Sequence, residues 1–83
     1  MSTPPQMPPV PLGSVPVGRH VEIFTMSLAR EVAARLRELG VREGALARIV
    51  HRAAGQVVLG IDEARIAVAT DAARRVLVRE QAA

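Results

Sequence analysis

The stretch that most constrains the fold of this chain is its centre, residues 35–44. Leu36 and Leu39 are the last apolar residues at helical spacing, and Gly40 follows at once. Glycine adopts the left-handed conformation that commonly ends a helix without a steric penalty. Gly44 comes four residues later, where a turn that needs a positive φ is expected. The centre therefore predicts the end of a helix, a tight turn and the start of a strand.

The predicted helix runs from about residue 28 to residue 39. Its apolar stripe consists of Leu28, Val32, Leu36 and Leu39, which recur at the helical period. Ser27 is the expected N-cap, with Thr25 as the alternative, because a hydroxyl can accept hydrogen bonds from the first turn. Glu31 and Arg35 have the i,i+4 spacing of an ion pair on the helix surface. We expect Leu36 and Leu39 to pack the helix onto the rest of the domain.

Short segments rich in β-branched residues predict strands on both sides of this helix. The predicted strands are residues 19–26, 45–52, 57–61, 65–69 and 76–78. We expect a hairpin connection at 54–56, a tight turn at Asp62 and Glu63, and a helical turn at 71–75 capped by Thr70. Gly60 within a strand predicts a bulge or a barrel corner. This order predicts a mainly β fold, a small SH3-like barrel of about five strands with one inserted amphipathic α-helix.

The prolines set the expected start of the domain. All six fall within the first 16 residues, so residues 1–10 are predicted to be a disordered, Pro-rich tail and residues 11–80 the folded domain. The chain contains no cysteine, so disulfides cannot stabilise it. It also lacks an apolar run of about 20 residues and a signal-peptide pattern, so we expect a cytoplasmic protein.

The charge pattern argues against a nucleic-acid-binding surface. The formal net charge is +3, but eight acidic residues are interleaved with eleven arginines. Two groups of arginines could contact phosphates, namely Arg48 with Arg52 on one strand, and Arg74, Arg75 and Arg79 near the C-terminus. Binders of single strands normally add aromatic stacking platforms, and Phe24 is the only aromatic residue. We therefore expect no nucleic-acid partner.

Residues for catalysis or metal binding are sparse. No nucleophile lies near a histidine in the sequence, and Asp62 and Glu63 are expected to face water in a turn, so we predict no enzymatic activity. His20 and Glu22 would share one face of a strand, and His51 lies on another strand, which makes these three the candidates for a divalent transition metal. A site needs three or more convergent donors, so no metal cofactor is predicted.

Residues from about 11 to 79 resemble the ferrous iron transport protein A (FeoA) family. The resemblance rests on Leu12 with Gly18, on the central Arg-Leu-x-x-Leu-Gly-x-x-x-Gly motif and on the closing segment from Ala73 to Val78. The motif residues are Arg35, Leu36, Leu39, Gly40 and Gly44, and their expected role is mainly structural. The chain departs from the family at residues 53–56, where many members have a Pro-x-Gly-Asp-Pro hairpin, and at residues 69–70, where many have a basic residue.

The resemblance implies a cytosolic accessory role in ferrous iron uptake. The implied partner is the membrane permease of that system, which carries a GTP-binding domain, so that the protein would be peripheral to the membrane only through its partner. The outward helix face and the turn after it are the expected partner-binding residues: Arg30, Arg37, Glu38, Arg42 and Glu43. The alternative is a transition-metal-binding or nucleic-acid-binding regulatory module, since a related SH3-like domain occurs in metal-dependent repressors.

Overall fold

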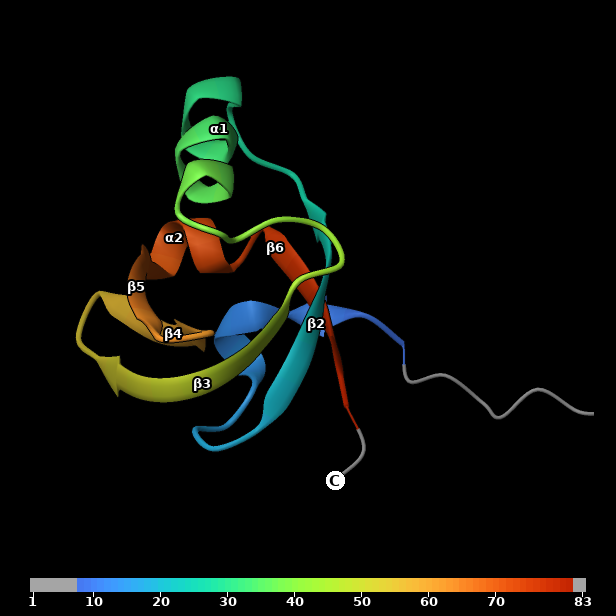
Figure 1. Cartoon of the computed structure of the whole chain (residues 1–83), viewed down its shortest axis with the longest axis vertical. Coiled ribbons are helices and arrows are strands. Elements are labelled where there is room, and N and C mark those ends of the chain that lie inside the picture. The colour runs from blue at the N-terminus through green and yellow to red at the C-terminus, as the bar shows by residue number, and fades with distance from the viewer. Residues whose placement is uncertain (1–7, 82–83) are drawn as a thin grey trace, which may run out of the picture.

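The structure is a computed structural model that describes residues 8–81, and it is built around one six-stranded antiparallel sheet (Figure 1). The strands are β1 (Val10–Pro11), β2 (His20–Met26), β3 (Leu46–Ala53), β4 (Gln56–Ile61), β5 (Ala64–Ala69) and β6 (Val76–Glu80). The helical elements are η1 (Leu12–Ser14), α1 (Arg30–Glu38) and α2 (Thr70–Ala73). The strand order is β1-β6-β2-β3-β4-β5. The predicted SH3-like fold is confirmed, with the two-residue β1 as a strand beyond the predicted five.

The curled sheet encloses a core made of aliphatic side chains. Every strand except β1 contributes fully or almost fully buried residues, and the largest are Leu12 from η1, Ile23, Ile49 and Leu59. Within residues 8–81 no polar or charged residue is buried. The helix α2 contacts β4, β5, β6 and η1, and so covers one opening of the barrel. Burial of apolar surface is therefore the main source of stability.

The first strand of the sheet begins one residue before the expected start of the domain. Val10 pairs with Val78, and Pro11 pairs with Leu77, so that β1 extends the sheet beside β6. Residues 1–7 of the predicted Pro-rich tail lie outside the described residues, and their disorder stays a prediction. In the part of the chain that the structure describes, no helix is long and apolar enough to cross a membrane.

The end of α1 follows the prediction from the central motif. Gly40 has φ +106°, and the N–H groups of Gly40 and Val41 donate to the carbonyls of Arg37 and Leu36 at 3.1 and 2.8 Å. These two hydrogen bonds form a Schellman motif, which requires a left-handed residue after the last helical one. Val41 then enters the core with no exposed surface. One turn thus ends the helix and anchors the chain that leaves it.

The start and the buried face of α1 differ from the prediction. The helix begins at Arg30, and its N-cap Ala29 makes no side-chain hydrogen bond. Ser27 lies two residues before this N-cap, and its backbone N–H donates to the carbonyl of Arg75 at 2.9 Å, which holds this part of the chain beside the segment before β6. The buried residues of α1 are Ala33 and Leu36, not the full predicted stripe. The helix projects from one end of the barrel (Figure 1), so only a narrow side of it is covered.

Two smaller predictions about local structure are also wrong. Thr70 is the first residue of α2 rather than its cap, and the N-cap Ala69 makes no side-chain hydrogen bond. The irregularity near Gly60 lies on the neighbouring strand, where the register of β3 shifts between Ile49 and His51. Gly60 itself pairs regularly on both sides. The glycine therefore marks a close approach of side chains from β3 and β5.

We expect the Leu36→Ala variant to lose about 2–5 kcal/mol of unfolding free energy, because the side chain is only 6% exposed and its removal leaves a cavity. Leu39→Ala is the matched control on the same helix. Its side chain is 48% exposed, so the expected change is about 0.5 kcal/mol or less. Urea denaturation of both variants measures the difference, and equal losses would contradict this assignment of the buried face.

Candidate partner-binding surface

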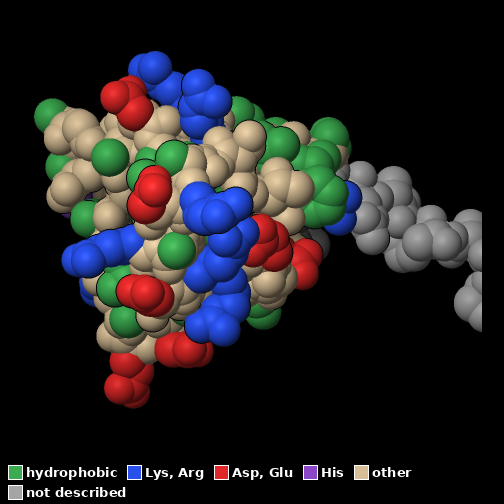
Figure 2. Space-filling view, turned by 90° about the horizontal axis from the view of Figure 1, so that it is seen from above, with side chains coloured by type: hydrophobic (Ala, Val, Ile, Leu, Met, Phe, Trp, Pro, Cys, Tyr) green, Lys and Arg blue, Asp and Glu red, His purple; other side chains and the backbone are tan. Residues whose placement is uncertain are grey.

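The charged residues of α1 and of the turn after it form one exposed surface. We call it the helix–turn surface, and it comprises Arg30, Arg37, Glu38, Arg42 and Glu43, all exposed. Figure 2 looks down on the end of the molecule from which α1 projects, and it shows acidic and basic side chains interspersed there. The structure thus places the five predicted partner-binding residues on one helix and the turn that follows it; their role in binding stays a prediction.

Three of these five side chains hold the turn in one conformation. Arg37 donates to Glu43 through Nε and Nη2, at 3.2 and 2.9 Å, which is a two-pronged ion pair between the helix and the turn. Arg42 Nη2 donates to the carbonyl of Arg37 at 3.3 Å, a carbonyl that also accepts from Gly40, and this places a positive charge at the C-terminal end of the helix, where it is favourable. A paired guanidinium and carboxylate have less rotational freedom than free ones. The surface is therefore partly preorganised.

The ion pair changes the titration of both partners. The hydrogen bond from Arg37 holds the pKa of the Glu43 carboxyl below its ordinary value of 4.5. The same hydrogen bond, with the charge of Glu43, raises the pKa of Arg37. Both side chains are about half exposed, so solvent screens their attraction and the pair contributes mainly orientation.

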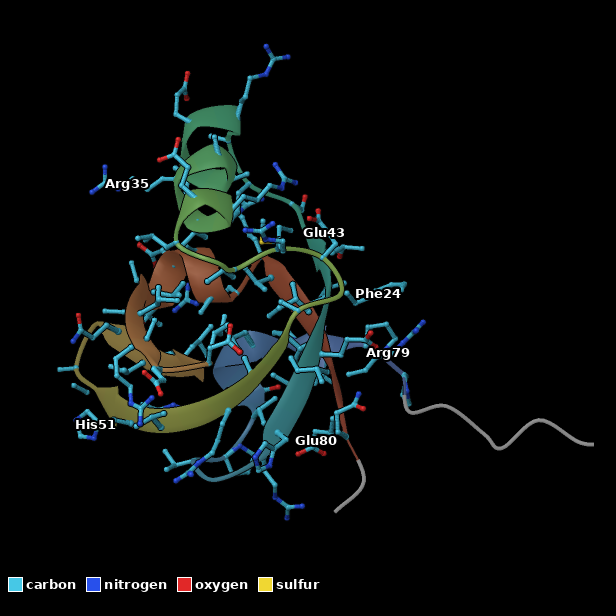
Figure 3. The ribbon with its side chains drawn as sticks, in the orientation of Figure 1. Phe24, Arg35, Glu43, His51, Arg79 and Glu80 are labelled. Atoms are coloured by element: carbon cyan, nitrogen blue, oxygen red, sulfur yellow. The ribbon has the colours of Figure 1, made fainter. Side chains whose placement is uncertain are left out.

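The other charged residues of α1 are less constrained. Within residues 8–81, neither Arg30 nor Glu38 forms a side-chain hydrogen bond or an ion pair. The predicted pair of Glu31 and Arg35 is also absent from the ion pairs of the described chain. Arg35, a residue of the central motif, points away from the barrel (Figure 3) and is exposed to solvent.

Two apolar residues accompany the charges on α1. Val32 and Leu39 are 43% and 48% exposed, although both belong to the predicted buried stripe. They are seven residues apart and so share one side of the helix. Helical spacing cannot distinguish a stripe that is covered by the barrel from one that is left open. The expectation that Leu39 packs onto the barrel is wrong, and Val32 and Leu39 leave an apolar area on the side of α1 opposite Arg30 and Arg37.

The metal candidates do not come together. His20 and Glu22 share the outer face of β2, as predicted, but their cross-strand neighbours on β3 are Arg48 and Leu46. His51 lies on β3 opposite Val58, beyond the register shift (Figure 3). No group of three or more His, Asp or Glu within residues 8–81 could hold a metal ion. A guanidinium beside His20 would also repel a cation.

The two arginine groups considered for phosphate contacts are dispersed as well. The extra residue of β3 reverses the alternation of side chains, so Arg48 lies on the outer face, whereas Arg52 pairs with the buried Val57 and donates to the carbonyl of Val15. Near the C-terminus, Arg74 pairs with Asp71 at 3.8 Å. Arg79 stacks on the Phe24 ring, 4.0 Å from its centroid (Figure 3). Neither group forms a continuous basic track.

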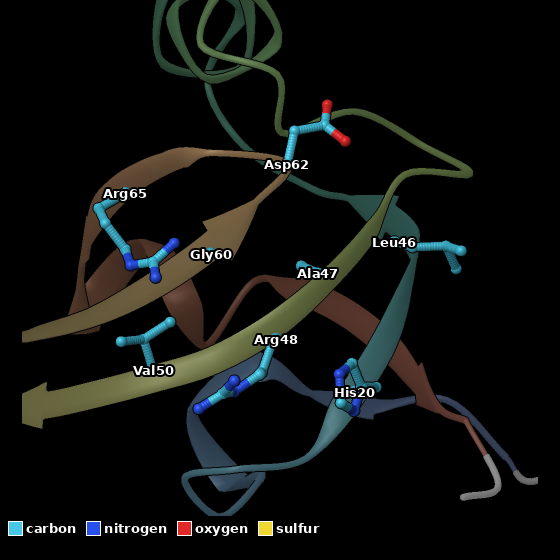
Figure 4. A pocket seen from close by; sticks show the side chains of 8 residues that line it. All are labelled: His20, Leu46, Ala47, Arg48, Val50, Gly60, Asp62 and Arg65. Carbon is cyan, nitrogen blue, oxygen red and sulfur yellow. The ribbon is translucent and has the colours of Figure 1, made fainter.

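Sequence reasoning missed a pocket on the outer face of the sheet. This pocket, which we call the arginine pocket, is lined by His20, Leu46, Arg48, Val50, Asp62 and Arg65, with Gly60 at its floor (Figure 4). It is an open depression of about 300 Å³. Four strands contribute to it, so the only signal in the sequence was the isolated glycine within a predicted strand.

We predict that the Glu43→Gln variant has a flatter pH dependence of stability than the parent protein. A carboxyl whose folded-state pKa is lowered stabilises the fold above its unfolded value of 4.5, and this stabilisation is lost as the pH falls through the folded value. The difference in unfolding free energy between the two proteins should therefore shrink from about pH 7 to about pH 3. Urea denaturation across this range measures it.

Glu38→Gln is the control for this experiment. Glu38 is exposed on the same surface and has no bonded partner within the described residues, so Glu38→Gln removes a carboxylate from this surface without breaking an ion pair. A constant difference between the parent and Glu43→Gln at all pH values would show that the ion pair does not form in solution.

The comparisons with known proteins agree with this geometry. The crystal structure of an iron uptake regulatory protein (FeoA) is 21% identical, with a TM-score of 0.79 over 90% of this chain and all of that one. The solution structure of an FeoA protein from Chlorobium tepidum is 19% identical, with a TM-score of 0.83 over 88% of this chain and 71% of that one. A manganese-dependent transcriptional repressor is 22% identical, with a TM-score of 0.78 over 93% of this chain but only 44% of the repressor.

These likenesses at low identity establish the fold alone. A search of curated proteins found no significant match. The family model for the FeoA domain matches residues 10–80, which is nearly the whole described chain. This match begins at Val10 and ends at Glu80, the first residue of β1 and the last of β6. The chain therefore belongs to the FeoA domain family.

Proposed function

We propose that this protein is a cytosolic accessory protein of ferrous iron uptake that acts by binding the GTP-binding membrane permease of that system. Membership of the FeoA domain family and the likeness to an iron uptake regulatory protein support the iron-uptake role. The permease is the partner that the resemblance implies. On this proposal the protein has no catalytic step of its own and changes what the permease does.

The helix–turn surface is the observation that carries the proposal of a protein partner. It is exposed, and the Arg37–Glu43 pair holds it in shape. The same helical segment also exposes two aliphatic side chains, Val32 and Leu39, on its other side. Protein interfaces combine apolar contact area with a polar surround, and interspersed charges select the partner and speed the encounter. Because the turn is already ordered, binding costs less conformational entropy.

The geometry gives less support to the alternative regulatory functions. A phosphate-binding surface would use clustered arginines, and Arg48 and Arg52 lie on opposite faces of the sheet. A transition-metal site would use His20, Glu22 and His51, which are separated in the described structure. A protein–protein role would use the exposed charges of the helix–turn surface and the ion pair that orders its turn.

We predict saturable binding of this protein to the cytosolic GTP-binding domain of the permease from the same organism, with an affinity that depends on the bound nucleotide. Isothermal titration without nucleotide, with GDP and with a non-hydrolysable GTP analogue measures it. The double variant R37E/E43R reverses both charges and retains the ion pair, so it should fold normally and bind about tenfold more weakly if the surface meets the partner.

Arg19→Glu is the control, because Arg19 is exposed and lies before β2, outside the helix–turn surface. Unchanged affinity of R37E/E43R would show that the helix–turn surface does not contact the partner. Absence of binding by the parent protein in every nucleotide state would refute the GTP-binding domain as the partner.

A further inference from the structure

The register of the sheet aligns three basic side chains and one glycine in a single row. His20 of β2 is opposite Arg48 of β3, Arg48 is opposite Gly60 of β4, and Gly60 is opposite Arg65 of β5. The row therefore crosses four neighbouring strands on the outer face of the barrel (Figure 4). None of the residues in this row is acidic, so no carboxylate within the row neutralises Arg48 or Arg65.

Gly60 makes the row into a trough between two arginines. Strands lie about 4.8 Å apart, so the Cα atoms of Arg48 and Arg65 are roughly 10 Å apart, with a residue lacking a side chain between them. A Cβ at Gly60 would lie 2.9 Å from Val50 Cγ2 and 3.0 Å from Arg65 Nη1. The Arg65 guanidinium thus lies against the glycine backbone, and packing against the floor helps to position it.

The charges of this pocket are not neutralised within the described chain. Neither Arg48 nor Arg65 forms an ion pair there, and the one side-chain hydrogen bond of Arg65 is a long one of 3.4 Å to the carbonyl of Ala64. The single carboxylate at the pocket is Asp62, at one end of it (Figure 4). The pocket therefore offers two guanidinium groups to an anion and one acceptor to a donor.

We propose that the arginine pocket binds an acidic segment of a protein partner, with Arg48 and Arg65 holding Asp or Glu carboxylates. Planar guanidinium groups match carboxylates, and such charge-assisted hydrogen bonds are among the strong ones. Asp62 can accept a backbone N–H of the same segment. Leu46, 64% exposed, and Val50 supply apolar contact for a neighbouring side chain. This site is separate from the helix–turn surface and does not depend on the identity of the permease as partner.

The composition of the pocket favours a peptide over a phosphate group or a nucleic acid. The Asp62 carboxylate would repel two negative charges concentrated on one phosphate group more strongly than carboxylates spaced along a peptide. Nucleobases bind by stacking on aromatic rings, and the one aromatic residue, Phe24, lies outside this pocket beneath Arg79. An exposed leucine beside the arginines has no use in binding a small anion but would contact an apolar residue of a peptide.

The test is an NMR titration of the ¹⁵N-labelled full chain with the peptide acetyl-Glu-Leu-Glu-Leu-amide. We expect saturable shifts at the backbone amides of Leu46, Arg48 and Gly60 and at the side-chain Nε–H of Arg65. Acetyl-Gln-Leu-Gln-Leu-amide and inorganic phosphate are the comparison probes, and both should bind about tenfold more weakly or not at all. Equal binding of the neutral peptide, or equal binding of phosphate, would overturn the assignment to an acidic segment.

Variants separate a specific site from general attraction to a cationic protein. Arg48→Gln and Arg65→Gln should each lower the affinity for the acidic peptide about tenfold. Gly60→Ala should also lower this affinity although both arginines are kept, because the added methyl group displaces Arg65. Arg74→Gln, which removes an exposed arginine of the α2 region, should leave the affinity unchanged. An equal loss of affinity in Arg74→Gln, or peptide-induced NMR shifts confined to α1, would refute peptide binding in the arginine pocket.

Discussion

The fold depends on the burial of small aliphatic side chains inside a curled sheet. With one aromatic residue and no cysteine, the chain has neither large rings nor disulfides to stabilise a small domain. Valine, isoleucine, leucine and alanine from the strands and helices form the core, and the described core contains no polar group. Because strands alternate between faces, the same sheet that forms this core must present its other residues to solvent. The outer surface is therefore set by the requirements of the core.

Two register shifts decide what that outer surface presents. The irregularity of β2 between Ile23 and Thr25 accompanies the outward position of Phe24, over which Arg79 stacks. The irregularity of β3 separates Arg48 from Arg52 and sends them to opposite faces. Extra residues in strands commonly re-aim side chains near functional sites. In this protein the shift in β3 lies just beyond the row of Arg48, Gly60 and Arg65.

The helix end shows how a local motif can position a binding surface. The glycine at position 40 ends α1, Val41 enters the core, and Arg37 reaches Glu43 across the turn. The two proposed interaction surfaces, at α1 and at the outer face of β3 to β5, rest on different elements. Two such surfaces allow contact with one partner at two places or with two partners at once.

The sequence by itself determined the fold class, the order of the elements and the end of the helix. These depend on the alternation of apolar residues along strands and on glycines that tolerate a positive φ, which are local properties. Only the tertiary structure decided which residues of α1 are buried, because helical spacing marks a stripe but not the part of it that the barrel covers. The tertiary structure also decided that the Ser27 N–H bonds to the carbonyl of Arg75, and it brought together the residues of the arginine pocket. That pocket depends on the register between four strands, and no single segment of the chain encodes it.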